Sequence, residues 1–216
     1  MSELLKINNL DVKFDTDEGR ITAVENVSIS VKQGEVLGIV GESGSGKSVT
    51  AKAIMQLNPG NTIYNEDAEI IIDGENVIKF TSKEDLKKIR GGKVSMIFQE
   101  PMASFAPAIK IGDQMVEQLL LHKNIKKEEA KSISLDMLTR VGITDTEKRF
   151  NQYAFELSGG MRQRAMIAMA LSTMPKLLLA DEPTTALDVT IQAQVLKLMK
   201  DIIKEYKMGV IFITHD

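Results

Sequence analysis

Residues 41–48 have the types and the spacing of a loop that binds phosphate. The segment GESGSGKS fits the pattern G-x-x-x-x-G-K-[ST] and lies between a predicted strand and a predicted helix. Glycines let several backbone N–H groups converge on phosphate oxygens, and a helix start adds positive potential. Lys47 could reach the β- and γ-phosphates of a nucleotide, while the hydroxyl of Ser48 could ligate Mg²⁺. A glycine-rich turn without a ligand is the alternative. The expected nucleotide contacts are Gly41, Glu42, Ser43, Gly44, Ser45, Gly46, Lys47 and Ser48.

Two carboxylates, Asp181 and Glu182, follow an apolar run. Residues 177–180 read LLLA, which predicts a buried strand, and acids at its carboxyl end lie where α/β sheets bind ligands. Asp181 could hold Mg²⁺. Glu182 could orient or deprotonate a water molecule that attacks a γ-phosphate. Taken alone, the pair could also be an acidic cap between a strand and a turn.

Short apolar runs and turn residues predict the elements that position these groups. Val36–Val40 predicts a buried strand before the loop, and Ser48–Leu57 predicts a helix that stops near Pro59 and Gly60. An early strand with Ile7, Val12 and Phe14 turns at residues 15–19 and returns through residues 21–31, which predicts a hairpin. Further strands are expected at 68–72, 94–98, 176–180 and 210–214, and helices at 161–171 and 190–206.

The middle of the chain changes character. Residues from about 111 to 143 have apolar side chains at helical spacing among many charges. Strands and helices alternate elsewhere with short connections, which is typical of a mostly parallel, covered sheet. We therefore expect one α/β domain over residues 1–216, with N-terminal antiparallel strands. Its core would comprise residues 1–98 and 166–216, and an inserted helical subdomain residues 99–165.

Composition excludes several classes of protein. The 216 residues suit one compact domain, and 43% hydrophobic and 26% charged residues are ordinary for a globular protein. The net charge of −3 provides no basic field for nucleic acid. The absence of cysteine excludes disulfides, thiolate metal sites and iron–sulfur clusters within this chain. The apolar runs are far shorter than the roughly 20 residues that cross a bilayer, and the start does not resemble a signal peptide.

With these motifs, the chain resembles the ATP-binding subunits of ABC transporters, specifically those of the oligopeptide, dipeptide and nickel import family. The resemblance runs from about residue 4 to the last residue and rests on three segments: VGESGSGKS, MIFQEPMASFAPAIKIGDQMVEQL and LSGGMRQRAMIAMALSTMPKLLLADEPTTALDVTIQAQVL. It implies an ABC cassette with the P-loop NTPase fold. Such a protein binds ATP and Mg²⁺, and it hydrolyses ATP to energise import of peptides or related small solutes.

The resemblance also implies roles for three single residues. Gln99 matches the glutamine that approaches Mg²⁺ and the attacking water, His215 the switch histidine that contacts the γ-phosphate, and Phe14 the aromatic that stacks on adenine. The alternatives are an exposed glutamine at a strand end, a structural histidine, and core packing of the phenylalanine. The implied catalytic set is Glu182, His215 and Gln99, and the implied metal set is Ser48, Gln99 and Asp181.

The signature segment LSGGMRQR implies a second copy of the cassette. Ser158, Gly159 and Gly160 match residues that contact a γ-phosphate bound on the partner, and a Ser-Gly-Gly helix start suits an anion. Asp188 ends the segment Ala186-Leu187-Asp188, which matches a loop that touches the partner's phosphate site. Both Ser158 and Asp188 could instead cap the helices that follow them, and for Asp188 the two roles are compatible.

The implied assembly lies at the cytoplasmic face of the cell membrane as a peripheral protein. A second ABC ATPase subunit, identical or different, would complete the dimer. Transmembrane permease subunits would contact residues 100–111, and an extracellular or periplasmic solute-binding protein would act indirectly. No nucleic acid is expected.

Three departures from the family pattern stand out. The subfamily often has asparagine where this chain has Ala106, and Pro-His where it has Ala154 and Phe155. These positions lie outside the phosphate site and concern the surface expected to contact the membrane subunits. The chain also stops at Asp216, where family members continue with a C-terminal segment, so a fragment or truncated chain is expected.

Two other functions are consistent with the superfamily. A non-transport ABC ATPase of DNA repair, chromosome organisation or translation would usually carry a coiled-coil or zinc insertion, or a second cassette. The compact stretch between Ser48 and Ser158 and the lack of cysteine disfavour it. A catalytically impaired nucleotide-binding protein is disfavoured by the presence of Glu182 and of the phosphate-facing residues.

Overall fold

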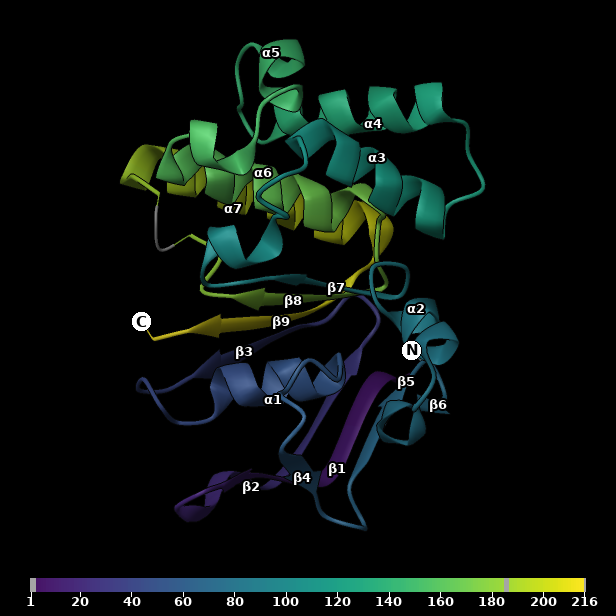
Figure 1. Ribbon diagram of the computed structural model, residues 1–216, viewed down its shortest axis with the longest axis vertical. Coiled ribbons are helices and arrows are strands. Elements are labelled where there is room, and N and C mark those ends of the chain that lie inside the picture. Colours follow the sequence, from purple (N-terminus) through teal and green to yellow (C-terminus); the bar gives the residue numbers. More distant parts are fainter. Residues whose placement is uncertain (1–2, 185–186, 216) are drawn as a thin grey trace.

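The computed structural model describes residues 3–184 and 187–215, which form two sheets and a group of helices. Figure 1 shows parallel strands in the middle, helices above them and an antiparallel sheet below. The strands are β1 (Glu3–Thr16), β2 (Gly19–Lys32), β3 (Val36–Val40), β4 (Thr62–Tyr64), β5 (Glu69–Ile72), β6 (Glu75–Asn76), β7 (Val94–Ile97), β8 (Leu177–Asp181) and β9 (Gly209–Thr214). The α-helices are α1 (Lys47–Ile54), α2 (Lys83–Ile89), α3 (Ile111–His122), α4 (Lys127–Arg140), α5 (Thr146–Phe150), α6 (Gly159–Ser172) and α7 (Val189–Tyr206). The 3₁₀ turns are η1 (Val77–Lys79), η2 (Pro101–Ser104) and η3 (Ala154–Glu156).

The parallel sheet is covered on both faces. Its strand order is β3-β9-β8-β7, and every residue of β8 is buried. Leu177 and Leu179 belong to the apolar cluster that β1, β5 and α1 share, whereas Leu178 and Ala180 belong to the cluster of α3, α4, α6 and α7. Successive strand residues point to opposite faces, so a strand buried on both sides reads as a continuous apolar run. The expected covered parallel sheet is confirmed.

The antiparallel sheet begins with the predicted hairpin. β1 pairs with β2 up to Thr16 opposite Gly19, so the turn lies within the expected residues 15–19. β1 also pairs with β4 and β5. Helix α1 contacts both β2 and β8 and therefore lies between the two sheets (Figure 1). This arrangement places the start of α1 beside the ends of the parallel strands.

The helices above the parallel sheet pack closely. α3 contacts α4, and α4 contacts α6. At Gly112, in the first turn of α3, a Cβ would lie 2.2 Å from the Cδ1 atom of Phe150. Helix α6 continues across residue 165, where the boundary between subdomain and core was expected. The division at that residue stays a prediction.

Helix α1 is shorter than predicted. It ends at Ile54 rather than at Leu57, because Gln56 takes a left-handed conformation with φ 53°. The N–H of Leu57 then donates to the carbonyl of Lys52, and that of Gln56 to Ala53. These two bonds form the Schellman motif, which usually contains glycine and is hard to recognise here. The strands expected at 68–72 and 94–98 are each one residue shorter, and α2, β4 and β6 were not predicted.

Candidate functional site

The loop after β3 has the backbone of a phosphate-binding loop. Gly44 and Gly46 have φ angles of 84° and 86°, which glycine adopts without steric cost. A Cβ at Gly46 would also lie 2.5 Å from the carbonyl oxygen of Ala23 on β2, so no side chain fits there. Gly46, the N-cap residue of α1, makes no side-chain capping hydrogen bond. The first N–H groups of this helix therefore remain available to an anion.

Lys47 folds back onto this loop. Its Nζ atom donates to the carbonyl oxygens of Gly41 at 2.6 Å and Glu42 at 2.7 Å, and to the Oγ atom of Ser45 at 3.3 Å. The ammonium group is thus held where the loop closes. Charged phosphate oxygens are stronger acceptors than these neutral oxygens, so a phosphate group could replace them.

Asp181 is buried at the end of β8, with only 3% of its surface exposed. Burial raises the pKa of its carboxyl group, the hydrogen bond with Ser48 lowers it, and the charge of Glu182 raises it further. Ser48 and Asp181 thus bring two oxygen groups together beside the phosphate loop. Magnesium prefers such hard oxygen ligands, and its charge would offset the cost of ionising a buried carboxyl. These residues fit the ion. The described residues contain no group of three or more His, Cys, Asp or Glu suited to a metal.

Glu182 lies between two polar side chains. Gln99 donates from Nε2 to the Oε2 atom of Glu182 at 3.2 Å, and the Nδ1 atom of His215 lies 3.1 Å from Oε1. The three residues follow β7, β8 and β9, and neighbouring parallel strands end at the same edge of the sheet. Glu182 also has an unusual φ of 47°. The glutamine and the histidine expected at the reaction site therefore lie together, and both contact the carboxylate.

A cavity of about 150 Å³ joins Gln99 and Glu182 to the phosphate loop, whereas His215 does not line it. Residues 43–49 line it together with Ala23, Gln99 and Glu182. Phe14 does not line this cavity; it is partly buried and packs against the apolar cluster of the antiparallel sheet. Core packing of Phe14 is thus observed, and stacking on adenine stays a prediction.

The predicted partner-facing residues lie at two helix starts outside this cavity. The Oγ atom of Ser158 accepts from the N–H of Met161 at 3.3 Å and caps α6. Ser158 and Gly159 are exposed, and a Cβ at Gly159 would have no atom within 4 Å. Asp188 is exposed and caps α7, accepting from the N–H of Ile191 at 3.0 Å. Both capping alternatives are therefore observed. Ala186, also expected in this loop, lies outside the described residues.

One functional candidate was missed. Gln163, within α6, is 1% exposed, and its Nε2 atom donates to the carbonyl oxygen of Pro183, the residue after Glu182, at 2.6 Å. The signal in the sequence is a glutamine at helical spacing from the buried Ile167 and Ala170, where an apolar residue would be expected.

The chain resembles known proteins over its whole length. A family model described as ABC transporter matches residues 24–185. The oligopeptide transport ATP-binding proteins OppD and AppD of Bacillus subtilis (strain 168) are each 50% identical over 216 residues, 100% of this chain. The dipeptide transport ATP-binding protein DppD of Lactococcus lactis subsp. cremoris (strain MG1363) is 47% identical over 99% of this chain. The chain spans 60%, 66% and 61% of the length of these three relatives.

Solved structures agree with this relationship. A dimeric structure of the ATP-binding cassette MJ0796 bound to ADP and Pi superposes with a TM-score of 0.87 and 29% identity, covering 98% of this chain and 88% of that one. The structure of cbiO1 from Clostridium perfringens gives 0.75 and 26%, with 100% and 80% covered. Within the part of the chain that the structure describes, no helix is both long and apolar enough to cross a membrane.

Proposed function

The chain belongs to the ABC transporter family, and we propose that it is the ATP-binding and ATP-hydrolysing subunit of an importer for peptides or related small solutes. The position of Glu182 carries this proposal. Its carboxylate borders the phosphate-loop cavity and is oriented by two polar side chains. A general base needs to lie within reach of a water molecule that faces the γ-phosphate.

Several residues of the cavity, together with Asp181, have distinct tasks in this reaction. The loop N–H groups and Lys47 bind the β- and γ-phosphates. Ser48 and Asp181 would hold Mg²⁺, which would supply charge neutralisation at the phosphate oxygens. Glu182 accepts a proton from the attacking water as the new O–P bond forms and the bond between the β- and γ-phosphates breaks. Products are ADP and inorganic phosphate.

Gln99 and His215 are assigned to orienting this base. The contacts to its two carboxylate oxygens fix the plane of the group. The orientation of a base relative to its water contributes strongly to the reaction rate, because the two groups are already held in the geometry that reacts.

The exposed signature residues support a dimer. Ser158, Gly159 and Asp188 lie at helix starts and do not line the cavity of their own chain. They are therefore assigned, with Gly160, to the nucleotide of a second ATPase subunit. The structurally similar cassette MJ0796 is described as a dimer.

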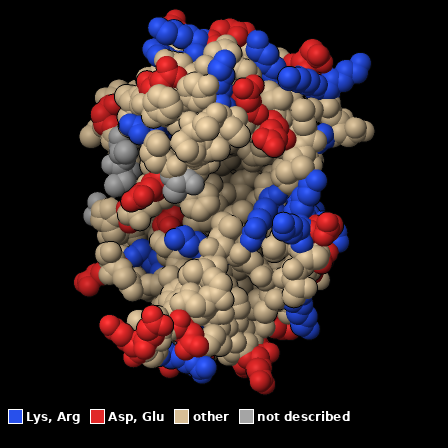
Figure 2. Space-filling view, viewed as in Figure 1, with Lys and Arg blue, Asp and Glu red and all other residues tan. Residues whose placement is uncertain are grey.

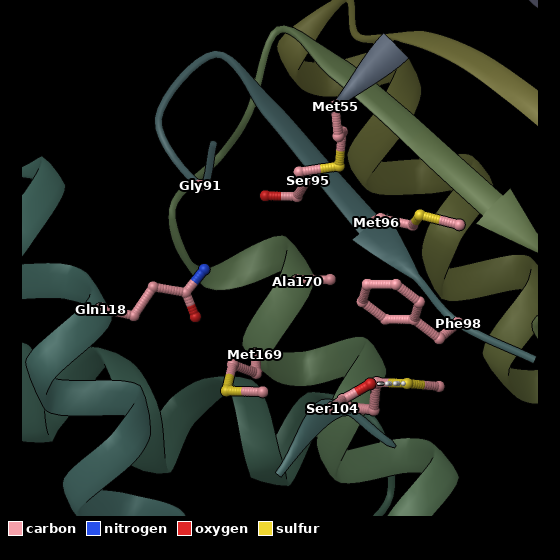
Figure 3. Close-up of a pocket in the computed structure, with 10 residues that line it drawn as sticks. Met55, Gly91, Ser95, Met96, Phe98, Ser104, Gln118, Met169 and Ala170 are labelled. Carbon is pink, nitrogen blue, oxygen red and sulfur yellow. Dashed lines mark hydrogen bonds between the residues drawn. The ribbon is translucent and has the colours of Figure 1, made fainter. Parts of the chain in front are cut away.

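An apolar cavity supports contact with a membrane subunit. The cavity is about 160 Å³ and lies among the end of α1, β7, η2, α3 and α6. Figure 3 shows Met55, Met96 and Met169 around it, and Figure 2 shows a hollow without charged atoms on this face. Methionine side chains adapt to different partners. We assign this cavity, with the exposed residues after Gln99, to a permease subunit at the cytoplasmic face of the membrane.

Glu182→Gln tests the proposed reaction. The amide keeps the size of the side chain but cannot accept a proton, so turnover should fall by about 10²–10⁴-fold, as for the loss of a general base. ATP binding should persist, and an ATP-dependent dimer should accumulate. Phosphate release, equilibrium binding and size-exclusion chromatography measure these effects. Glu66→Gln, at an exposed loop position, is the matched control. Undiminished hydrolysis would remove Glu182 from its role.

A further inference from the structure

Gln163 connects the signature helix to the backbone beside Glu182. The side chain lies within α6, one turn after the exposed Ser158 and Gly159, and it is 1% exposed. Its Nε2 atom donates to the carbonyl oxygen of Pro183 at 2.6 Å, a short hydrogen bond. The two residues come from different elements, since Pro183 follows β8. This bond is therefore a direct link between α6 and the segment that carries the carboxylate.

The oxygen atom of the Gln163 amide is costly to bury. Among the described residues, the Oε1 atom of Gln163 has no hydrogen-bond partner. A buried acceptor without a partner is unfavourable, and such groups are rare in native proteins. An unbranched apolar side chain of similar length would fill the same space without that cost, but it would leave the carbonyl of the buried Pro183 without its donor. The stabilising and destabilising contributions of this amide oppose each other, so what distinguishes the glutamine is its bond to the backbone beside Glu182.

The backbone at Glu182 needs external support. Its φ of 47° is in the left-handed region, which residues other than glycine seldom occupy. On one side, the N–H of Glu182 donates to the carbonyl of Ile213 on β9 at 3.0 Å. On the other side, Gln163 holds the carbonyl of the next residue. Backbone conformations of this kind persist where several surrounding contacts hold them in place, often at active sites.

From this arrangement we propose that Gln163 is a positioning residue for hydrolysis. Its amide fixes the Pro183 carbonyl and thereby the direction in which the carboxylate of Glu182 points. Because Gln163 and the signature residues share one rigid helix, a nucleotide that contacts the start of α6 also influences this carboxylate. The inference rests on the proposed function and adds a connection between the two nucleotide sites of a dimer.

Gln163→Met and Gln163→Leu test the inference, because both remove the donor and leave an apolar side chain of comparable size. We expect kcat for ATP to fall at least tenfold in both variants, since small displacements of a catalytic group can cost up to about 10²-fold in rate. The KM for ATP should stay within threefold of wild type. Thermal unfolding of Gln163→Met should occur near the wild-type temperature, because removal of the unpartnered Oε1 acceptor offsets the loss of the bond to the Pro183 carbonyl. A role in folding alone would lower that temperature and leave kcat per folded molecule unchanged.

Ser172→Ala is the matched control on the same helix. Ser172 is also buried, but its hydroxyl donates only to the carbonyl of Met169 within α6. This variant should keep wild-type kcat. A kcat within twofold of wild type in Gln163→Met, or in Gln163→Leu should the first not fold, would overturn the inference. Glu182→Gln assayed in parallel separates the two failures: if it loses turnover while the Gln163 variants keep theirs, only the positioning role is wrong.

Discussion

Asp181→Asn should stabilise the nucleotide-free protein while abolishing its Mg²⁺-dependent activity. Asp181 is 3% exposed, next to a second carboxylate at Glu182, so its charge is poorly solvated. Asparagine has nearly the same shape and can still accept from Ser48. Substitutions that relieve such functional costs typically gain about 0.5–2 kcal/mol. For a domain of this size, 1 kcal/mol corresponds to about 2–4 °C in Tm.

The gain in folding stability of Asp181→Asn should increase as the pH rises. The unfolded chain releases the proton of Asp181 near the ordinary pKa of about 3.9. In the folded chain, burial raises this pKa, so the folded state keeps its proton to higher pH. Between these values the folded state binds more protons, and the stability of the wild type falls as pH rises. Asparagine does not titrate. The stability difference should therefore be small below about pH 4 and grow until the raised pKa is passed.

Urea unfolding at several pH values measures this difference, and calorimetry with ATP and Mg²⁺ measures binding. Asp17→Asn, at the exposed hairpin turn, removes the same formal charge without a buried carboxyl. A loss of stability in Asp181→Asn at neutral pH would refute the reasoning. It would mean that the hydrogen bond with Ser48 and the nearby lysines already compensate the buried charge in the free protein.

Two further substitutions test the structure. Gly112→Ala should destabilise the fold by about 1–3 kcal/mol in urea unfolding, because overpacking against Phe150 outweighs the gain of about 1 kcal/mol in helix propensity. Gly159→Ala is the control and should not destabilise the fold, because a Cβ there has no atom within 4 Å. A Gly112→Ala variant more stable than wild type would contradict the observed packing against Phe150. Lys47→Met should weaken ATP binding by about 10–150-fold in calorimetry, because it removes a charged hydrogen bond worth about 1.5–3 kcal/mol. An unchanged Kd would show that, in the wild type with ATP bound, the lysine stays bonded to its own loop.

Patterns in the sequence predicted the elements whose burial is regular. β8 was recognised because a strand covered on both faces must be apolar throughout. The hairpin of β1 and β2 was recognised from alternation and an acidic turn. The end of α1 was missed because a left-handed Gln56 does the work usually done by glycine. Short elements such as β4 and β6 depend on pairing with strands distant in the sequence or too short to show a pattern, so no local sequence pattern predicts them.

In the candidate site as well, some features could be predicted from the sequence and others could not. Residues 41–48 are contiguous, so their spacing alone predicts a phosphate loop. Glu182 was assigned from its place at the end of a predicted buried strand, and Gln99 and His215 through resemblance. Only the structure shows that these two side chains flank the carboxylate of Glu182. Gln163 escaped notice because its partner is a backbone carbonyl, which leaves no trace in the identity of residue 183.

The parallel register is what brings these distant residues to one carboxylate. Asp181 on β8 lies opposite Ile213 on β9, and the N–H of Glu182 continues that ladder to the carbonyl of Ile213. His215 comes two residues after Ile213, directly after the end of β9, and lies within reach of Glu182. A shift of β9 by one residue would turn alternate side chains to the opposite face and remove the histidine from the carboxylate. The apolar residues of β9 that fix this register, Val210 towards the helices and Ile211 towards the antiparallel sheet, therefore determine the geometry of the site as well as the stability of the core.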